Sequence, residues 1–398
     1  MHKVPDPVAQ AVRALRLKDP VIERAENPKA VLHFADRAGL SLFLPQEMFG
    51  AEDREALARR LEDNRQRLVQ IRQLYSEVAD RLRVQGIPFT FLKGLTQCGL
   101  SGHDPERRVQ YDIDLLTPPD AAHAAAEALG NLGFEPFQSM EGMPIDHLPP
   151  LIRRTGWEFR GDYFDPEIPT SLEVHFRLWD CDSLRLDAPG LDDFFARREG
   201  DRLAAADALG FGAMHLLKHL LLGSVRAFHV YELACILERQ HGNAPLWKQW
   251  RETHAPALRR LECVAFRLAH EWFACSMPEA VQQDWLALPA SSRAWFTRFA
   301  WSPLEPANKD ELWLHCSLIE STRDRAAVIR RRLAPLRMPG PVRGVHLKDE
   351  QRTLGRRMAA AAAQANFMAG RLVHHATAAV RLAGSGARWW RHLRTLHG

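Results

Sequence analysis

The sequence predicts an α+β protein: a small mixed β-sheet with flanking helices, then a helical lobe and a basic helical tail. Three observations support this prediction. Short apolar runs alternate with amphipathic stretches in the first half, the chain reads as helix from about residue 191, and residues 321–398 hold 16 Lys and Arg against 3 Asp and Glu. With 398 residues, 46% of them hydrophobic, the chain is long enough for two or three packing units.

The first half predicts the sheet and its helices. One long helix is expected over 52–84, because apolar residues recur there every three or four positions and Gly86 and Pro88 follow it. We expect a strand over 89–92, a brief helix over 95–100, a second strand over 111–116 and a helix over 119–132. Further strands are expected near 157–163 and 172–179.

The second half predicts helices. They are expected over 213–239 and, as one helix or a pair, over 246–273, with a break at Pro303 and Pro306. An arginine-rich helix, a linker over 335–344 and an Ala/Arg helix complete the chain. The predicted units are an N-terminal helical segment (1–50), a core (51–185), a helical domain (186–320) and a basic helical segment (321–398).

Two aspartates on the second predicted strand form the sharpest motif. In Asp112-Ile113-Asp114, strand geometry places both carboxylates on one face, roughly 7 Å apart, and Ile113 on the other. Such a pair is costly unless it is solvated, paired or bound to cations, and Mg²⁺ prefers oxygen ligands of this kind. The alternative is two solvated aspartates at the end of a strand.

A Lys-Gly turn precedes this strand. Lys93 and Gly94 follow the first strand and come directly before a helix start. A glycine there lets backbone N–H groups approach a phosphate, and Lys93 would add a positive charge. An ordinary strand-to-helix turn explains the same residues.

Together these motifs resemble a known family. Phe91-Leu92-Lys93-Gly94, followed by Arg108-Val109-Gln110-Tyr111-Asp112-Ile113-Asp114-Leu115-Leu116, is similar to the signature of the bacterial uncharacterised nucleotidyltransferases, within the DNA polymerase β-like superfamily. The resemblance implies transfer of a nucleoside monophosphate from an NTP to an acceptor, with Mg²⁺ or Mn²⁺ as cofactor. The acceptor is left open among a small molecule, sugar, peptide, RNA and protein.

The resemblance also implies a third carboxylate on a neighbouring strand. Glu173 is the choice, as catalytic residue and metal ligand beside Asp112 and Asp114, because its stretch alternates as a half-buried strand should and puts His175 on the same face. Glu158 and Asp162 are the rivals for this role.

The nucleotide would be held by the turn and by a nearby arginine. Lys93, Gly94 and Arg108 are the expected nucleotide-binding residues, and Arg108 would contact a phosphate or hold the aspartates in place. An ordinary arginine of a surface loop is the alternative for Arg108. The chain departs from better-understood superfamily members, which carry Gly-Ser at the phosphate turn. A non-catalytic descendant that binds a nucleotide or partner, or a phosphotransferase using the same site, is therefore the alternative function.

Other basic residues have two interpretations each. Lys218 and Arg226 would reach a triphosphate or belong to a solvated helix face. His215 and His219 have the i, i+4 spacing of a zinc pair, but the surrounding leucines favour a buried helix.

The tail and the ends of the chain bear on partners and location. The basic tail is expected to dock on the acidic body through Leu333, Leu336, Met338 and the Trp389-Trp390 pair, with peripheral contact to an anionic membrane as the alternative. A nucleic-acid partner is not expected. Six scattered cysteines and an N-terminus without an apolar run predict a cytoplasmic protein.

Overall fold

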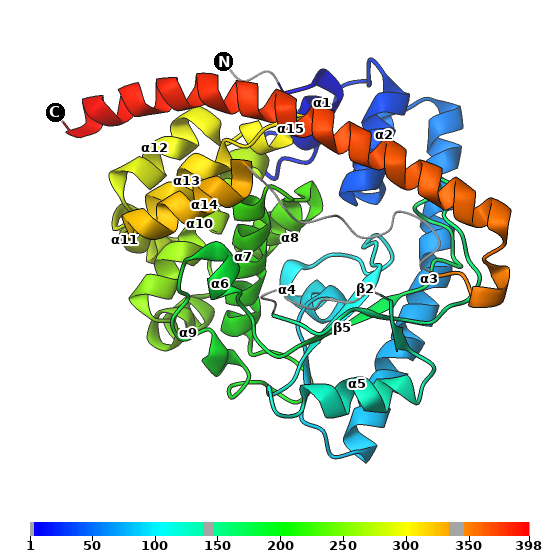
Figure 1. Ribbon diagram of the computed structural model, residues 1–398. Helices are drawn as coiled ribbons and strands as arrows, with labels where there is room; N and C mark the ends of the chain where they lie inside the picture. The colour runs from blue at the N-terminus through cyan, green and yellow to red at the C-terminus, as the bar shows by residue number, and fades with distance from the viewer. Residues whose placement is uncertain (1–3, 138–145, 334–345, 398) are drawn as a thin grey trace.

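The computed structural model describes residues 4–137, 146–333 and 346–397, and its centre is a five-stranded mixed sheet (Figure 1). The strand order is β1-β2-β5-β4-β3, with β2 and β5 parallel and the other neighbours antiparallel. The strands are β1 (Thr90–Phe91), β2 (Asp112–Leu116), β3 (Glu135–Pro136), β4 (Leu151–Ile152) and β5 (Ser171–His175). The predicted α+β class is confirmed.

Helices α3 (Ala51–Val84) and α5 (Ala122–Gly130) cover one face of the sheet. Ile113 and Leu115 point to this face and are fully buried with apolar side chains of both helices. The long helix predicted over 52–84 is thus present, with Gly86 in a left-handed conformation just beyond its end. The brief helix expected after the Lys-Gly turn is present as η3 (Gly94–Gln97) and α4 (Cys98–Ser101).

The opposite face of the central strands looks towards a helical lobe. Leu116, on that face of β2, belongs to a large buried cluster that includes α7 (Ala205–Leu222), α8 (Ala227–Gln240) and α10 (Pro256–Phe273). Helices α1 (Asp6–Ala14) and α2 (Pro28–Ala38) pack into the same cluster. The remaining lobe helices are α6 (Cys181–Leu184), α9 (Ala244–Thr253), α11 (Glu279–Leu286), α12 (Ala290–Phe299) and α13 (Glu311–Leu318). The predicted domain boundaries stay a prediction.

Three expectations about elements differ from the structure. Residues 157–163, all of them described, form no strand, because Gly156 and Gly161 take φ angles of 87° and 95°, which break an extended backbone. The helix expected over 213–239 is two helices, since Gly223 adopts a left-handed conformation (φ 69°) that ends α7. The strand expected over 172–179 ends at His175.

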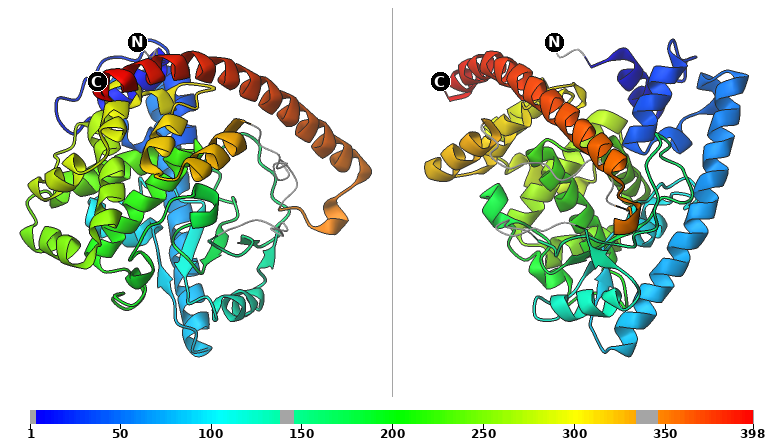
Figure 2. Two further views of the ribbon diagram at one scale, coloured as in Figure 1. Left: turned by 60° about the vertical axis from the view of Figure 1, so that its left-hand side comes forward. Right: turned by 45° about the vertical axis from the view of Figure 1, so that its right-hand side comes forward.

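The basic tail consists of α14 (Thr322–Leu333) and α15 (Leu354–His397), which runs along one side of the molecule to the helical lobe (Figures 1 and 2). The predicted linker at 335–344, including Leu336 and Met338, lies outside the described residues. The tail docks through Val328 and Trp389, which are buried, whereas Leu333 and Trp390 are exposed. Among the described residues, no helix has both the length and the apolar character that crossing a membrane requires.

Candidate active site

The three predicted carboxylates lie on one face of β2 and β5. Asp114 pairs in register with Glu173 on the parallel neighbour, and alternation along β2 brings Asp112 to the same face. Asp114 is buried at 2% side-chain exposure, Glu173 is one quarter exposed, and Asp112 is the most open at 38%. The structure therefore brings the three carboxylates together on one face, and their catalytic and metal-binding roles stay a prediction.

His175 completes this acidic face. Its Nε2 lies 3.1 Å from Asp114 Oδ1 and 3.6 Å from Glu173 Oε2, and its Nδ1 lies 3.9 Å from Asp146 Oδ2. Burial works against the imidazolium, but these carboxylates outweigh burial and raise the pKa of His175 to about 9. Burial would raise the pKa of Glu173, yet the hydrogen bond from His175 holds it below its ordinary value.

Lys93 places an ammonium group between the two aspartates. Its Nζ lies 3.2 Å from Asp114 Oδ2, 3.9 Å from Asp112 Oδ2 and 3.2 Å from His215 Nε2. Burial lowers the pKa of Lys93, but the negative charges of Asp112, Asp114 and Glu173 prevail and raise it above its usual range. The lysine is therefore charged and serves as the counter-ion of the acidic face.

Histidines of the helical lobe face the acidic strands. His215 and His219 on α7 approach each other at 3.2 Å between their Nε2 atoms, and the ring of His229 on α8 lies 5.0 Å from that of His215. Burial, followed by the charge of Lys93, lowers the pKa of all three, to about 4 for His219. These imidazoles are accordingly neutral at neutral pH.

A cavity of about 460 Å³ separates the two sides. Sheet, turn and lobe all contribute to its wall. Besides the acidic face, Lys93 and the three histidines, the lining residues include Arg37, Gly39, Arg108, Tyr111, His147, Lys218, Ser224 and Arg226. The side chains of Arg37 and Arg226 are exposed and make no hydrogen bond or ion pair within the described part of the chain, so two free cations face an opening whose floor is acidic.

Packing behind the turn leaves no room for a side chain at Gly94. Its φ is 77°, and a Cβ would come within 2.5 Å of the Tyr75 hydroxyl and 2.6 Å of Gln110 Nε2. The Tyr75 hydroxyl donates to the Lys93 carbonyl at 3.2 Å, and Gln110 donates to the Asp112 carbonyl at 2.6 Å. Gly94 thus lets helix α3 hold the turn and β2 together, which fixes Lys93 beside the aspartates.

Arg108 is engaged by the helical lobe. Its Nε donates to Glu232 of α8 at 2.7 Å, both side chains are buried, and its guanidinium lies 5.2 Å from the centre of the Phe228 ring. It lines the cavity, so the predicted phosphate contact stays a prediction, and the pair already ties the entry of β2 to the lobe.

The structure separates the other expected residues into two groups. Lys218 and Arg226 reach the cavity, although Lys218 is bound by the buried Asp146. Glu158 pairs instead with Arg356, and Asp162 accepts a hydrogen bond from the Phe164 backbone at 2.8 Å, so neither rival of Glu173 lines the cavity.

Sequence reasoning missed His147, His229 and Arg37 as cavity residues, and Asp146 as the buried partner of Lys218 behind them. These residues come from segments without regular alternation or from helices read as buried, so no local pattern could have identified them. His175 had a signal, because its spacing from Glu173 already placed it on the same strand face.

A metal ion could be held by part of this face. The ligand atoms of Asp114, Glu173 and His175 all lie within 4.8 Å of one another, and among the described residues they are the one group of three or more potential ligands so arranged. His215 and His219 do approach each other, but no described residue adds a third ligand at that range, so the described geometry favours no zinc site there.

The mixed sheet thus presents several carboxylates on adjacent strands, across a cavity from basic side chains. The chain matches the uncharacterised nucleotidyltransferases over residues 26–274, which is more than half of its length. It therefore belongs to the uncharacterised nucleotidyltransferase family, and membership gives its general class of reaction as nucleotidyl transfer. Neither a curated protein nor a solved structure is similar enough to match it.

Proposed function

We propose that the protein is a Mg²⁺- or Mn²⁺-dependent enzyme that transfers a nucleoside monophosphate from an NTP to an acceptor. The acceptor is a small molecule, sugar, peptide or protein. The observation that carries the proposal is the alignment of Asp112, Asp114 and Glu173 on one face of β2 and β5, at the floor of a cavity whose rim is cationic.

The donor set fits a divalent cation. Asp114 and Glu173 offer oxygen ligands, Asp112 adds a third carboxylate that is open to the cavity, and His175 offers a nitrogen at the same point. When bound, the cation would polarise the phosphate under attack and offset its charge. His175 must be neutral to ligate, and its raised pKa therefore predicts that protons compete with the metal.

The chain's own residues would orient the nucleotide. Arg226 and Arg37, free of partners among the described residues, lie where the triphosphate would enter, and Lys218 lies deeper on α7. Lys93 is already charged. On nucleotide binding, its ammonium group would give up a contact with an aspartate and form one with a phosphate oxygen. Gly94 would keep the turn close to the phosphates, and Arg108 would either contact a phosphate or hold β2 in register with α8.

The first test replaces the aspartates with an isosteric neutral residue. Asp112→Asn with Asp114→Asn should lower nucleotide transfer by more than about a hundredfold, because even residues that only orient metal ligands are worth about 10- to 100-fold. The assay follows label from α-³²P NTP into an acceptor fraction with Mg²⁺ or Mn²⁺. The matched control is Asp80→Asn with Asp349→Asn, two largely exposed aspartates outside the cavity. Full transfer by the cavity variant would refute the assignment.

A label on the γ-phosphate distinguishes nucleotidyl transfer from the first alternative, phosphoryl transfer. A phosphotransferase using the same carboxylates would pass the γ-label to the acceptor and leave the α-label in a nucleoside diphosphate. Transfer of the α-label together with release of pyrophosphate supports nucleotidyl transfer.

The position of Lys93 favours a second alternative, a non-catalytic descendant that binds a nucleotide. Its ammonium already neutralises the aspartate pair without a metal ion. Calorimetric titration of the wild-type protein with ATP, in Mg²⁺ and in EDTA, separates the two. An ATP affinity that depends on Mg²⁺, together with turnover, supports the enzyme. An ATP affinity that is the same in Mg²⁺ and in EDTA, without turnover, supports the binding protein.

A further inference from the structure

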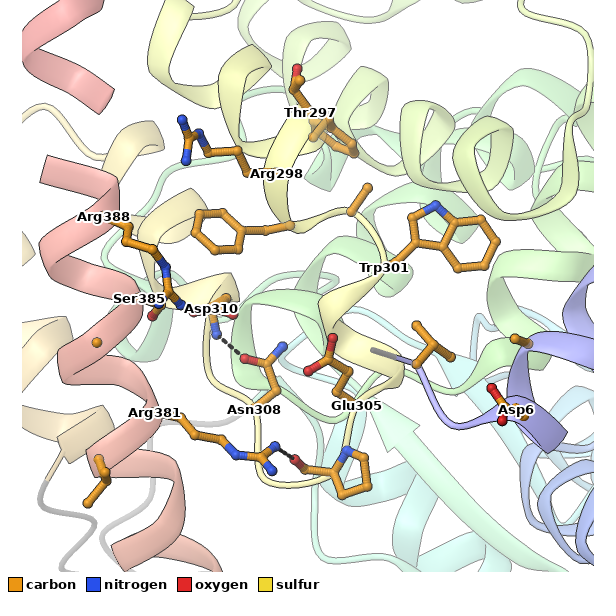
Figure 3. Close-up of a pocket in the computed structure, with 18 of the residues that line it drawn as sticks. Asp6, Thr297, Arg298, Trp301, Glu305, Asn308, Asp310, Arg381, Ser385 and Arg388 are labelled. Carbon is orange, nitrogen blue, oxygen red and sulfur yellow. Dashed lines mark hydrogen bonds between the residues drawn. The ribbon is translucent and has the colours of Figure 1, made fainter. Parts of the chain in front are cut away.

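The inner face of α15 holds the helix against the lobe. Ala378, Leu382, Ser385 and Trp389 are buried there, and the Trp389 ring lies 5.7 Å from that of Phe299 on α12. Beside this contact is a groove of about 1360 Å³ between α15, α12 and α1 (Figure 3). Within it, the Arg381 guanidinium donates to the Pro306 carbonyl at 2.6 Å. Polar and apolar contacts therefore fix which side of α15 points inwards.

The outer face of α15 carries an uncovered apolar stripe. Starting at Leu354, exposed apolar residues recur every three or four positions to Trp390, with alanines between the larger side chains. Its large members are Leu354, Met358, Leu372, Val373, Val380 and Trp390, each 59–76% exposed. Of the fifteen large hydrophobic side chains that the described residues expose, seven are on α15, so apolar exposure is concentrated on this one helix.

Charge on α15 has one sign. The helix contains seven arginines, spread from Arg356 to Arg394, and no Asp or Glu. Arg381 and Arg388 line the inner groove, and the other five do not. The chain before residue 321 carries 37 basic and 46 acidic residues, so its net charge is opposite to that of the tail. An anionic surface would attract α15 and repel the rest of the molecule, which orients the contact.

The apolar stripe and the positive charge together indicate which kind of partner binds the outer face of α15. A second copy of α15 would bring its arginines against those of the first, with no acidic residue on either helix, which opposes self-association through this face. A nucleic acid would pair with the arginines but leave the apolar stripe uncovered. A bilayer with anionic headgroups satisfies both, since apolar side chains enter the headgroup boundary while arginines reach phosphates from long aliphatic stems.

We propose that the outer face of α15 binds the surface of an anionic lipid bilayer and holds the nucleotidyltransferase body at the membrane. The contact is peripheral, with the helix lying parallel to the surface, because its exposed apolar side chains run from Leu354 to Trp390, along most of its length.

The test is cosedimentation of the full chain with vesicles of phosphatidylcholine alone or of equal parts phosphatidylcholine and phosphatidylglycerol. The wild-type protein should bind the anionic vesicles and not the neutral ones, and binding should weaken as the salt concentration rises. Leu372→Gln with Val380→Gln removes two members of the stripe at constant charge. It should lower partitioning by about tenfold or more, because each side chain loses its buried apolar area.

The matched control is Val84→Gln with Leu286→Gln, which changes exposed side chains of similar size off α15 (78% and 64% exposed). It should bind vesicles as the wild type does. Circular dichroism and melting temperatures unchanged in both variants exclude misfolding, since all four positions are exposed.

Four outcomes overturn the proposal. They are no binding to anionic vesicles at low salt, equal binding to neutral vesicles, and full binding by the stripe variant. The fourth is a second partner in place of lipid, seen either as a duplex RNA or DNA shift without vesicle binding or as a dimer that Leu372→Gln with Val380→Gln dissociates.

Discussion

At the scale of single residues, Lys93 links the sheet to the helical lobe. Its ammonium contacts both aspartates of β2 and His215 of α7. Because the pKa of Lys93 is raised in the folded protein, the charged lysine contributes stability at every pH below its ordinary titration range, and that contribution is lost only as pH rises through the raised value. The lysine and a bound metal would be alternative counter-ions for the same carboxylates.

Lys93→Met tests this competition. Removal of the ammonium leaves the buried Asp114 without its cation and should destabilise the metal-free protein by about 3 kcal/mol or more. Mg²⁺ should then raise the melting temperature of the variant more than that of the wild type. Lys248→Met, a change at a lysine side chain that is 75% exposed, serves as control. An equal Mg²⁺ response in all three proteins would mean that Lys93 and the metal do not share a site.

The two neighbouring glycines, Gly94 and Gly99, make a matched pair. Gly94→Ala should destabilise the fold by about 2 kcal/mol or more, because φ is 77° and the new Cβ meets Tyr75 and Gln110. Gly99→Ala should be neutral or stabilise by about 0.5–1 kcal/mol, since it lies in α4 with nothing within 4 Å of its Cβ. Urea unfolding measures both. Equal effects would contradict the packing explanation.

The same contacts make Gly94→Val a poor test of phosphate binding. Any side chain at this position collides with Tyr75 and Gln110, which support the turn. Loss of NTP affinity in such a variant would therefore report damage to β2 as well as to the turn, and the arginines of the rim are the cleaner probes.

At the scale of elements, the site depends on the registration of β2 with α8. The Arg108–Glu232 pair joins the segment before β2 to the lobe, with both side chains below one tenth exposed. Burial would lower the pKa of Arg108, but Glu232 raises it beyond its usual range, so the pair remains ionised. An ion pair of this kind fixes geometry more than it adds stability, because both charges have lost water.

A double-mutant cycle separates the two roles of Arg108. Arg108→Met should lower the free energy of unfolding by about 3–5 kcal/mol, because Glu232 is left buried and unpaired. Adding Glu232→Met should restore most of this stability. If Arg108 also contacts a phosphate, the double variant will regain stability yet bind NTP more weakly. Recovery of both stability and affinity would show that Arg108 only positions β2.

At the scale of the whole molecule, the tail combines a docked inner face with an exposed outer one. Trp389→Ala should destabilise by about 3–5 kcal/mol, because a side chain that is 2% exposed leaves a cavity against α12. Trp390→Ala, one position on and 59% exposed, should change stability by less than about 0.5 kcal/mol. Thermal unfolding measures the pair, and similar losses in both would contradict the observed orientation of α15.

Truncation after residue 320 also tests how much the docked tail stabilises the rest of the protein. It removes α14 and α15, uncovers Leu312 and Ile319, and takes Arg332 from the buried Glu311. A lower melting temperature is therefore expected, as the docking of the tail implies.

The sequence by itself determined the features that depend on local period and spacing. The alternation in Asp112-Ile113-Asp114 and around Glu173 set which side chains share a face, and the three- and four-residue repeat set α3. These patterns are short-range, because a strand alternates every two residues and a helix every 3.6.

Tertiary structure alone decided which distant groups meet. His147, Arg37 and His229 reach the cavity from a loop and two helices. Arg108 pairs with Glu232 across 124 positions, and Gly94 packs against Tyr75. Which side of α15 faces solvent was settled the same way. Such contacts follow from how whole elements pack, and a side chain carries no local signal of the partner that packing will bring to it.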